Sequence, residues 1–276
     1  MKKVVLIAAV LVSYCLSGLS QGPQMQIPGK EVFKNDDVVF HQIDDHTWVG
    51  TGHLMSNESL YLVEGNDKAV LIDAGTNIKD LDKIVASITS KPVMLVATHV
   101  HPDHTGRSIN VFPEIYLNPA DTVSIPQMMA GYPGTVKYLK DGQIIDLGGR
   151  TLEVVFTPGH TPGSTTFIDK DAHFGFSGDA FGSGNLLLTT SFSTLLSTCE
   201  KVSALMDKYE LTKLYPGHYF GGNPETKQRV DDMATICKDV LAGKLEGTEN
   251  PRGMMGLNRV ITQYGVRINY SENQLK

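Results

Sequence analysis

The chain has 276 residues, of which 41% are hydrophobic, and a formal net charge of −6. This composition excludes a largely disordered chain and is sufficient for one large globular domain. The acidic balance argues against a nucleic-acid partner, because binding to phosphates needs a basic surface.

Residues 1–20 have the pattern of a secretory signal peptide. Met1–Lys3 is a basic start, Val4–Val12 is an apolar run too short to span a bilayer, and small residues lead up to Ser20. We expect cleavage after Ser20 and a periplasmic or secreted protein with no stable membrane insertion. Lipid attachment at Cys15 and an uncleaved anchor are less favoured alternatives. Cleavage would leave 22 basic residues against 30 acidic ones, a net charge of −8.

Residues 21–36 are polar and contain proline and glycine, so we expect a flexible lead-in before a single domain at residues 37–276. The first half of this domain has short apolar runs separated by turn residues, which predicts an antiparallel meander, one helix and a buried strand. The expected strands are Val38–Ile43, Thr47–Thr51, Leu60–Val63, Ala69–Ile72 and Pro92–Ala97, and the helix is Ile78–Ile88, capped by Thr76 or Asn77.

The second half of the domain repeats strands followed by helices. Residues 120–129 are expected to be helix or loop, followed by a Gly/Pro break at residues 131–134. Strands are expected at Glu114–Leu117, Gln143–Leu147, Leu152–Phe156, Thr165–Ile168, His173–Phe176 and around Val260–Asn269, and helices at Phe192–Lys208 and Lys227–Leu241. Sheets covered by helices, an α+β arrangement, are therefore the expected fold class.

Two cysteines, Cys199 and Cys237, would remain after signal cleavage, and both lie in predicted helices. An exported protein could pair them in a disulfide, but we expect them to pack as small apolar residues. Neither accompanies a group of histidines.

Three imidazoles and a carboxylate fall within six positions, from His99 to His104, directly after the buried strand at residues 92–97. His99 and His101 are two residues apart, so on an extended segment their rings project to the same side and can converge on one ion. Pro102 prevents a regular continuation and directs Asp103 and His104 elsewhere, which favours a second ion beside the first. The alternative is a histidine-rich surface loop.

Two more histidines follow short apolar runs in Pro-Gly-His settings. His160 follows the run at residues 152–156, and His218 follows the run at residues 211–215. A strand that ends in Pro-Gly-His places an imidazole at the end of the strand, as in the first cluster, so the pattern favours a shared metal site.

The chain resembles the metallo-β-lactamase superfamily over roughly residues 37 to 220. Five motifs of that superfamily occur in order, which are Leu71-Ile72-Asp73-Ala74-Gly75, Thr98 to Gly106, Thr157 to Ser164, Ser177-Gly178-Asp179 and Pro216-Gly217-His218. The resemblance implies a four-layer αββα sandwich, in which two mixed β-sheets lie between helices.

The resemblance also implies a site for two zinc ions, with iron as the alternative metal. Three protein ligands for each ion would leave positions open for water, which is typical of catalytic zinc. Asp73 would orient a ligating imidazole from behind. The implied ligands are His99, His101 and His160 for one ion, Asp103, His104 and His218 for the other, and Asp179 as the bridge between them.

The activity implied is hydrolysis, with a hydroxide held between the two ions attacking a carbonyl group. Asp103 would orient the attacking water and carry its proton. Tyr219, Ser183 and Asn185 are candidates for substrate or oxyanion contacts, by their proximity in the sequence alone.

We therefore expect the domain at residues 37–276 to be an exported hydrolase of a small ester, lactone, thioester or amide. A β-lactamase that acts on antibiotics is the second interpretation, and no cysteine occupies a ligand position. An iron enzyme that performs oxidative or sulfur chemistry is the third, because ligand type alone does not separate zinc from iron.

Overall fold

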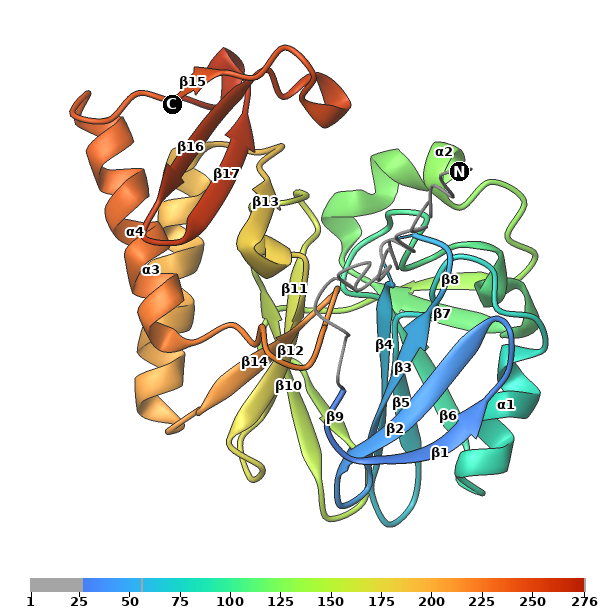
Figure 1. Ribbon diagram of the computed structural model, residues 1–276. Coiled ribbons are helices and arrows are strands. Elements are labelled where there is room, and N and C mark those ends of the chain that lie inside the picture. The colour runs from blue at the N-terminus through green and yellow to red at the C-terminus, as the bar shows by residue number, and fades with distance from the viewer. Residues whose placement is uncertain (1–26, 56, 276) are drawn as a thin grey trace, which may run out of the picture.

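The computed structural model describes residues 27–55 and 57–275, which form three β-sheets and four α-helices (Figure 1). The largest sheet has eight strands arranged in their chain order. It is mixed, because β1 to β5 pair antiparallel whereas β5 to β8 run parallel. Its strands are β1 (Lys30–Lys34), β2 (Val38–Asp44), β3 (Thr47–Gly52), β4 (Ser59–Glu64), β5 (Ala69–Ile72), β6 (Val93–Val96), β7 (Glu114–Leu117) and β8 (Thr135–Tyr138).

The second sheet has five strands in the order β14-β12-β11-β10-β9. It is also mixed, since β12 and β14 are parallel and the other pairs are antiparallel. Its strands are β9 (Ile144–Asp146), β10 (Thr151–Phe156), β11 (Thr165–Asp169), β12 (Phe174–Gly178) and β14 (Lys213–Pro216).

A third sheet of four strands, in the order β13-β17-β16-β15, is formed mainly by the C-terminal part of the chain. It comprises β13 (Asn185–Leu187), β15 (Thr248–Glu249), β16 (Arg259–Gln263) and β17 (Val266–Tyr270). The helices are α1 (Leu81–Ile88), α2 (Ile125–Met128), α3 (Phe192–Lys208) and α4 (Lys227–Leu241), with short 3₁₀ turns η1 (Arg107–Val111), η2 (Pro119–Ser124), η3 (Gly182–Gly184), η4 (Met254–Gly256) and η5 (Glu272–Gln274).

The two large sheets are stacked, with α1 on one outer face and α3 and α4 on the other (Figure 1). Strand β4 shows why the run at residues 60–63 within it is apolar. Leu60 and Leu62 face the layer that contains α1, whereas Tyr61 and Val63 face the second sheet. Successive side chains of a strand point to opposite faces, so a strand buried on both sides needs a continuous apolar run. The four-layer αββα sandwich is confirmed, with the third sheet as an addition to it.

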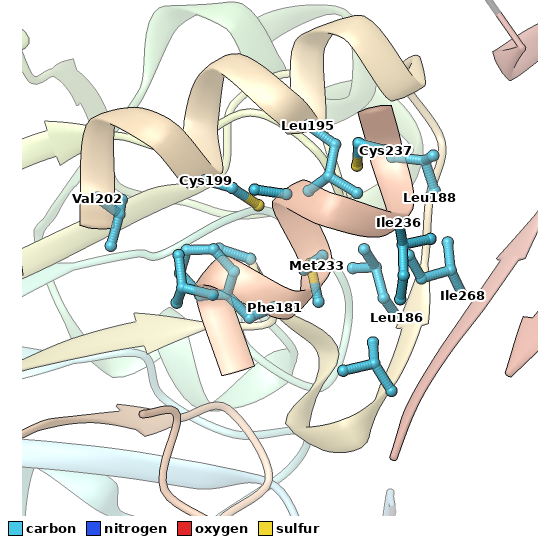
Figure 2. Packing of buried hydrophobic residues seen from close by; sticks show 14 of the residues in the cluster. Phe181, Leu186, Leu188, Leu195, Cys199, Val202, Met233, Ile236, Cys237 and Ile268 are labelled. Atoms are coloured by element: carbon cyan, nitrogen blue, oxygen red, sulfur yellow. The ribbon is translucent and has the colours of Figure 1, made fainter. Parts of the chain in front are cut away.

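The side of the second sheet covered by helices encloses a separate apolar cluster (Figure 2). Cys199 projects into it from α3 and Cys237 from α4, and the same cluster includes Phe181 and Met233. Both thiols are free and buried, as expected for small apolar residues, and burial raises the pKa of each. Within the described residues, no helix is both long and apolar enough to cross a membrane.

Three details differ from the sequence-based expectations. Residues 30–34 are not part of a flexible lead-in but form edge strand β1, whose Phe33 packs against the core beside α1. Helix α1 begins at Leu81 rather than at Ile78, because Asp80, the residue before it, has a left-handed backbone (φ 53°), which a right-handed helix cannot include.

The last expected strand is a hairpin, β16 and β17. Tyr264 and Gly265 have φ of 53° and 73°, the positive pair that a tight two-residue turn requires. The predicted signal peptide and Cys15 lie outside the described residues, as do residues 21–26 of the lead-in.

Candidate metal centre

Four strand ends deliver polar side chains to one edge of the stacked sheets. The segment after β6 carries His99, His101, Asp103 and His104, and the segments after β10, β12 and β14 carry His160, Asp179 and His218. Backbone bonds connect these segments. The N–H of Thr165 donates to Thr98 O, and the N–H of Gly217 donates to Gly178 O. The two sheets thus hold the segments in a fixed arrangement.

The first group consists of three imidazoles. His101 Nδ1 lies 3.1 Å from His99 Nε2 and 2.8 Å from His160 Nε2, so the three nitrogens converge on one point. Burial lowers the pKa of His99 well below its usual value and that of His101 to about 4. Both rings are therefore neutral near pH 7, the form in which imidazole binds a metal.

The second group consists of Asp103, His104 and His218. Asp103 Oδ2 lies 3.4 Å from His218 Nε2 and 3.8 Å from His104 Nε2. Asp179 lies between the two groups. Its Oδ2 is 3.5 Å from His218 Nε2, 3.7 Å from His160 Nε2 and 3.8 Å from His104 Nε2. Seven side chains therefore offer donor atoms in two adjoining sets, and Asp179 can contribute to both.

Partners behind the rings determine which imidazole nitrogen faces the centre. Asp73 Oδ2 lies 2.8 Å from His104 Nδ1, and it also accepts a hydrogen bond from Thr98 Oγ1 at 2.7 Å. His160 Nδ1 lies 2.8 Å from the carbonyl oxygen of Leu187. A proton on each of these Nδ1 atoms leaves Nε2 as the donor towards the centre.

The electrostatics of the second group fit a cation. Burial would lower the pKa of His104, but Asp73, Asp103 and Asp179 raise it well above its usual value. His104 Nε2 and Asp179 Oδ1 are buried and have no hydrogen-bond partner in the structure. A buried polar atom without a partner is costly, and a metal ion would satisfy both atoms and supply the positive charge that the carboxylates stabilise.

Asp121 was not predicted from the sequence, although it joins the two loops that carry the first group. This buried carboxylate accepts hydrogen bonds from the backbone N–H groups of Gly163 (2.7 Å) and Val100 (3.2 Å) and from Thr161 Oγ1 (3.2 Å). Its sequence context, just after Asn118-Pro119-Ala120, is typical of a helix start. No local signal indicates that it reaches loops 21 and 42 residues away.

Side chains of β4 also fix the segment that carries His218. Ser59 and Tyr61 of β4 hold it, because Tyr61 donates to Pro216 O at 2.6 Å and Ser59 Oγ accepts from Tyr219 N at 2.9 Å. Gly217 allows a close approach to the centre. A Cβ atom there would lie 2.2 Å from Asp179 Oδ1 and 2.7 Å from His104 Cε1.

Of the three candidates for substrate contacts, Ser183 and Asn185 line the cavity above the centre, and Tyr219 does not. Asn269 donates to Asn185 Oδ1 at 2.9 Å, which orients the amide of Asn185. Tyr219 is buried, and its hydroxyl donates to Gly221 O at 2.8 Å. The donor of Tyr219 is thus engaged away from the cavity.

The cavity has a volume of about 520 Å³, within the usual range of small-molecule sites, roughly 300–1,000 Å³. His101, Asp103, His160, Asp179 and His218 form its polar end. Apart from Ser183 and Asn185, methionines and other apolar residues make up most of the remaining lining. Among the described residues that line it, none is lysine or arginine. An adjoining cavity, which shares Pro102 and Met128, contains Arg107.

An αββα sandwich with two adjoining sets of histidine and aspartate donors at one edge is the architecture of a metal-dependent hydrolase class. The chain belongs to the metallo-beta-lactamase superfamily, whose family model matches residues 56–218. Relatives in this superfamily are hydrolases.

The chain is 29% identical over 204 residues to the acyl-coenzyme A thioesterase MBLAC2 of Homo sapiens, covering 58% of this chain and 72% of the relative. It is 26% identical over 196 residues to hydroxyacylglutathione hydrolase of Synechococcus sp., covering 64% and 74%. The solved structure of a metallo-beta-lactamase from Pontibacter korlensis matches this chain with a TM-score of 0.58 at 17% sequence identity. The match covers 74% of this chain and 100% of that one, and it shows a similar fold.

Proposed function

We propose that the protein is an exported dinuclear zinc hydrolase that cleaves small acyl compounds, namely esters, lactones or thioesters. The observation that carries the proposal is the pair of three-donor groups that share Asp179 at the polar end of a cavity. Three protein ligands for each ion are typical of catalytic zinc, whereas structural zinc usually has four protein ligands. Export rests on the pattern of residues 1–20 alone.

Two bound zinc ions would supply Lewis acidity for the substrate carbonyl and lower the pKa of a water molecule. The residues of the chain have separate tasks. Asp103 would accept the proton of the attacking water, since its Oδ2 faces the centre and His104 and His218 keep its pKa low in spite of burial. Asp73 and Leu187 hold His104 and His160 in the required tautomer.

The lining of the cavity favours an uncharged acyl substrate. A β-lactam carries a carboxylate, and the described lining offers no lysine or arginine to pair with it. A β-lactamase is therefore the less favoured alternative. A thioester with an anionic leaving group is a stronger second candidate, because a relative of this chain is named an acyl-coenzyme A thioesterase and Arg107 lies in the adjoining cavity.

The proposal is tested by elemental analysis of the purified protein, combined with assays on a p-nitrophenyl ester, a lactone, a thioester and nitrocefin. We expect about two zinc ions per chain and turnover of at least one acyl substrate. Iron with no hydrolysis would move the protein to oxidative or sulfur chemistry, and a protein that binds no metal would overturn the proposal.

Replacing Asp103 by alanine should reduce kcat by at least about 100-fold, because a positioned general base contributes roughly 10²–10⁴-fold. Asp171→Ala removes an exposed carboxylate outside the cavity and is the matched control. Full activity of the Asp103 variant would contradict the role given to this residue.

A further inference from the structure

The cavity has an apolar end as well as a polar one. Six apolar side chains line it, and they come from segments far apart in the sequence, so their meeting is a product of the fold. We call them the apolar rim, and they are Met55, Met128, Leu187, Phe220, Met254 and Met255.

The rim is exposed to an unusual degree. Met254 and Met255 are 66% and 54% exposed, Met55 is 43% exposed and Phe220 is 38% exposed. Single exposed apolar residues are common on proteins, but a cluster around one cavity marks a place where apolar material binds. Methionine is well suited to this task, since its flexible side chain adapts to varied apolar shapes.

The turn that presents two of the methionines is held in place. Met255 has a left-handed backbone (φ 57°), an uncommon conformation for a residue other than glycine. The N–H of Leu257 donates to Met254 O at 3.0 Å, and Leu257 itself is buried. The N–H of Asn250 donates to Asn258 O at 2.6 Å and closes the base of the turn. The methionines are therefore displayed by an anchored turn.

We infer that the apolar rim is a subsite for the hydrocarbon chain of the substrate, and that the preferred substrates are uncharged esters or thioesters of medium-chain or longer acids. The inference rests on the proposed hydrolase function. The scissile carbonyl would lie at the histidine and aspartate end, with the chain along the methionines. Water adds its oxygen to the acyl carbon, the C–O or C–S bond breaks, and the alcohol or thiol leaves with a proton while the acid is released.

Chain length gives the direct test. Each methylene that leaves water should raise kcat/KM about two- to fourfold, so p-nitrophenyl octanoate should exceed the butyrate at least about tenfold. The double variant Met254→Gln, Met255→Gln keeps side-chain length and flexibility but removes apolar character. It should bring the octanoate-to-butyrate ratio close to one, mainly through a lower kcat/KM for the octanoate.

Leu241→Gln is the matched control, because Leu241 is 40% exposed at the end of α4 and is not part of the cavity lining. It should leave the ratio unchanged. A wild-type enzyme with no preference for the longer chain, or a double variant that keeps the full preference, would overturn the inference.

A binding measurement separates this inference from the proposed function. Octan-1-ol and butan-1-ol, which are uncharged, are titrated into the protein calorimetrically, with no turnover required. Tighter binding of octan-1-ol that the double variant loses would support the subsite even if no ester were hydrolysed, in which case the hydrolase proposal alone would fail. Hydrolysis of short esters together with equal binding of both alcohols would overturn the subsite and leave the hydrolase proposal standing.

Discussion

Replacing Asp73 by asparagine should weaken one metal site without unfolding the protein. Asp73 accepts three hydrogen bonds, from Thr98 N (2.7 Å), Thr98 Oγ1 (2.7 Å) and His104 Nδ1 (2.8 Å). Asparagine has nearly the same shape, and its oxygen can still accept from Thr98 N. Its NH₂ group would then face His104 Nδ1 and the hydroxyl of Thr98, which can turn to accept.

The substitution would change the tautomer of the His104 ring. An amide N–H opposite Nδ1 makes that nitrogen an acceptor, so the proton of the neutral ring moves to Nε2, the atom that faces Asp103 and Asp179. A protonated Nε2 cannot bind a metal. Loss of such an orienting partner typically costs 10–100-fold in metal affinity. We expect this loss at the site of Asp103, His104 and His218, with the His99 site much less affected.

The assay is a zinc titration against a chromophoric chelator, with zinc per chain measured after dialysis. If the proposed dinuclear zinc site is correct, the wild type should retain about two zinc ions and the Asp73→Asn variant about one. The far-UV circular dichroism of the variant should be unchanged. Asp171→Asn makes the same substitution at an exposed position and should bind as the wild type does. Two tightly bound ions in the Asp73 variant would refute the tautomer argument.

Three further predictions concern other parts of the centre. Gly217→Ala should cut activity at least tenfold, since its Cβ would meet Asp179 Oδ1 at 2.2 Å, whereas Gly222→Ala, with no atom within 4 Å of the new Cβ, should stay active in the same assay. Tyr219→Phe should leave kcat within about twofold but lower the free energy of unfolding by about 0.5–1.5 kcal/mol, the usual value of one hydrogen bond, and a large loss of kcat would return Tyr219 to the catalytic candidates. The last prediction concerns the metal-free protein, prepared with a chelator. Burial lowers the pKa of His218, but Asp103 and Asp179 raise it to about 10, which is above the value of about 6.5 in the unfolded chain. The metal-free protein should therefore lose stability as pH rises from about 6.5 towards 10, and His218→Gln should reduce the fall in melting temperature over that window, while His104, whose pKa is also raised, keeps part of it.

The elements with strong periodicity were predictable from the sequence. Helices α3 and α4 have the predicted bounds, because an apolar stripe at helical spacing and capping residues, Ser191 and Thr226, mark their extent. Short strands such as β8 and β13 were not predicted. Three or four residues carry too little pattern, and their pairing is decided by strands distant in the chain.

The candidate donors were found because they occur in runs of unusual composition, and the structure brings all seven together. Their supports were harder to find. Asp121 and Tyr61 act on residues 21 to 155 positions away, and nothing in the local sequence distinguishes them from an ordinary turn aspartate or core tyrosine. The rim methionines Met254 and Met255 also lie in a segment beyond the family match at residues 56–218.

The third sheet has a consequence for how this protein can diversify. Leu187, at the end of β13, contributes to the rim and also accepts from His160 Nδ1 through its backbone oxygen. Strand β13 is paired to β17, and Asn269 of β17 donates to Leu186 O. Mutations in the C-terminal hairpin that reshape the entrance would therefore also disturb a histidine donor. Substrate range and metal retention would have to evolve together, because the same strand carries both.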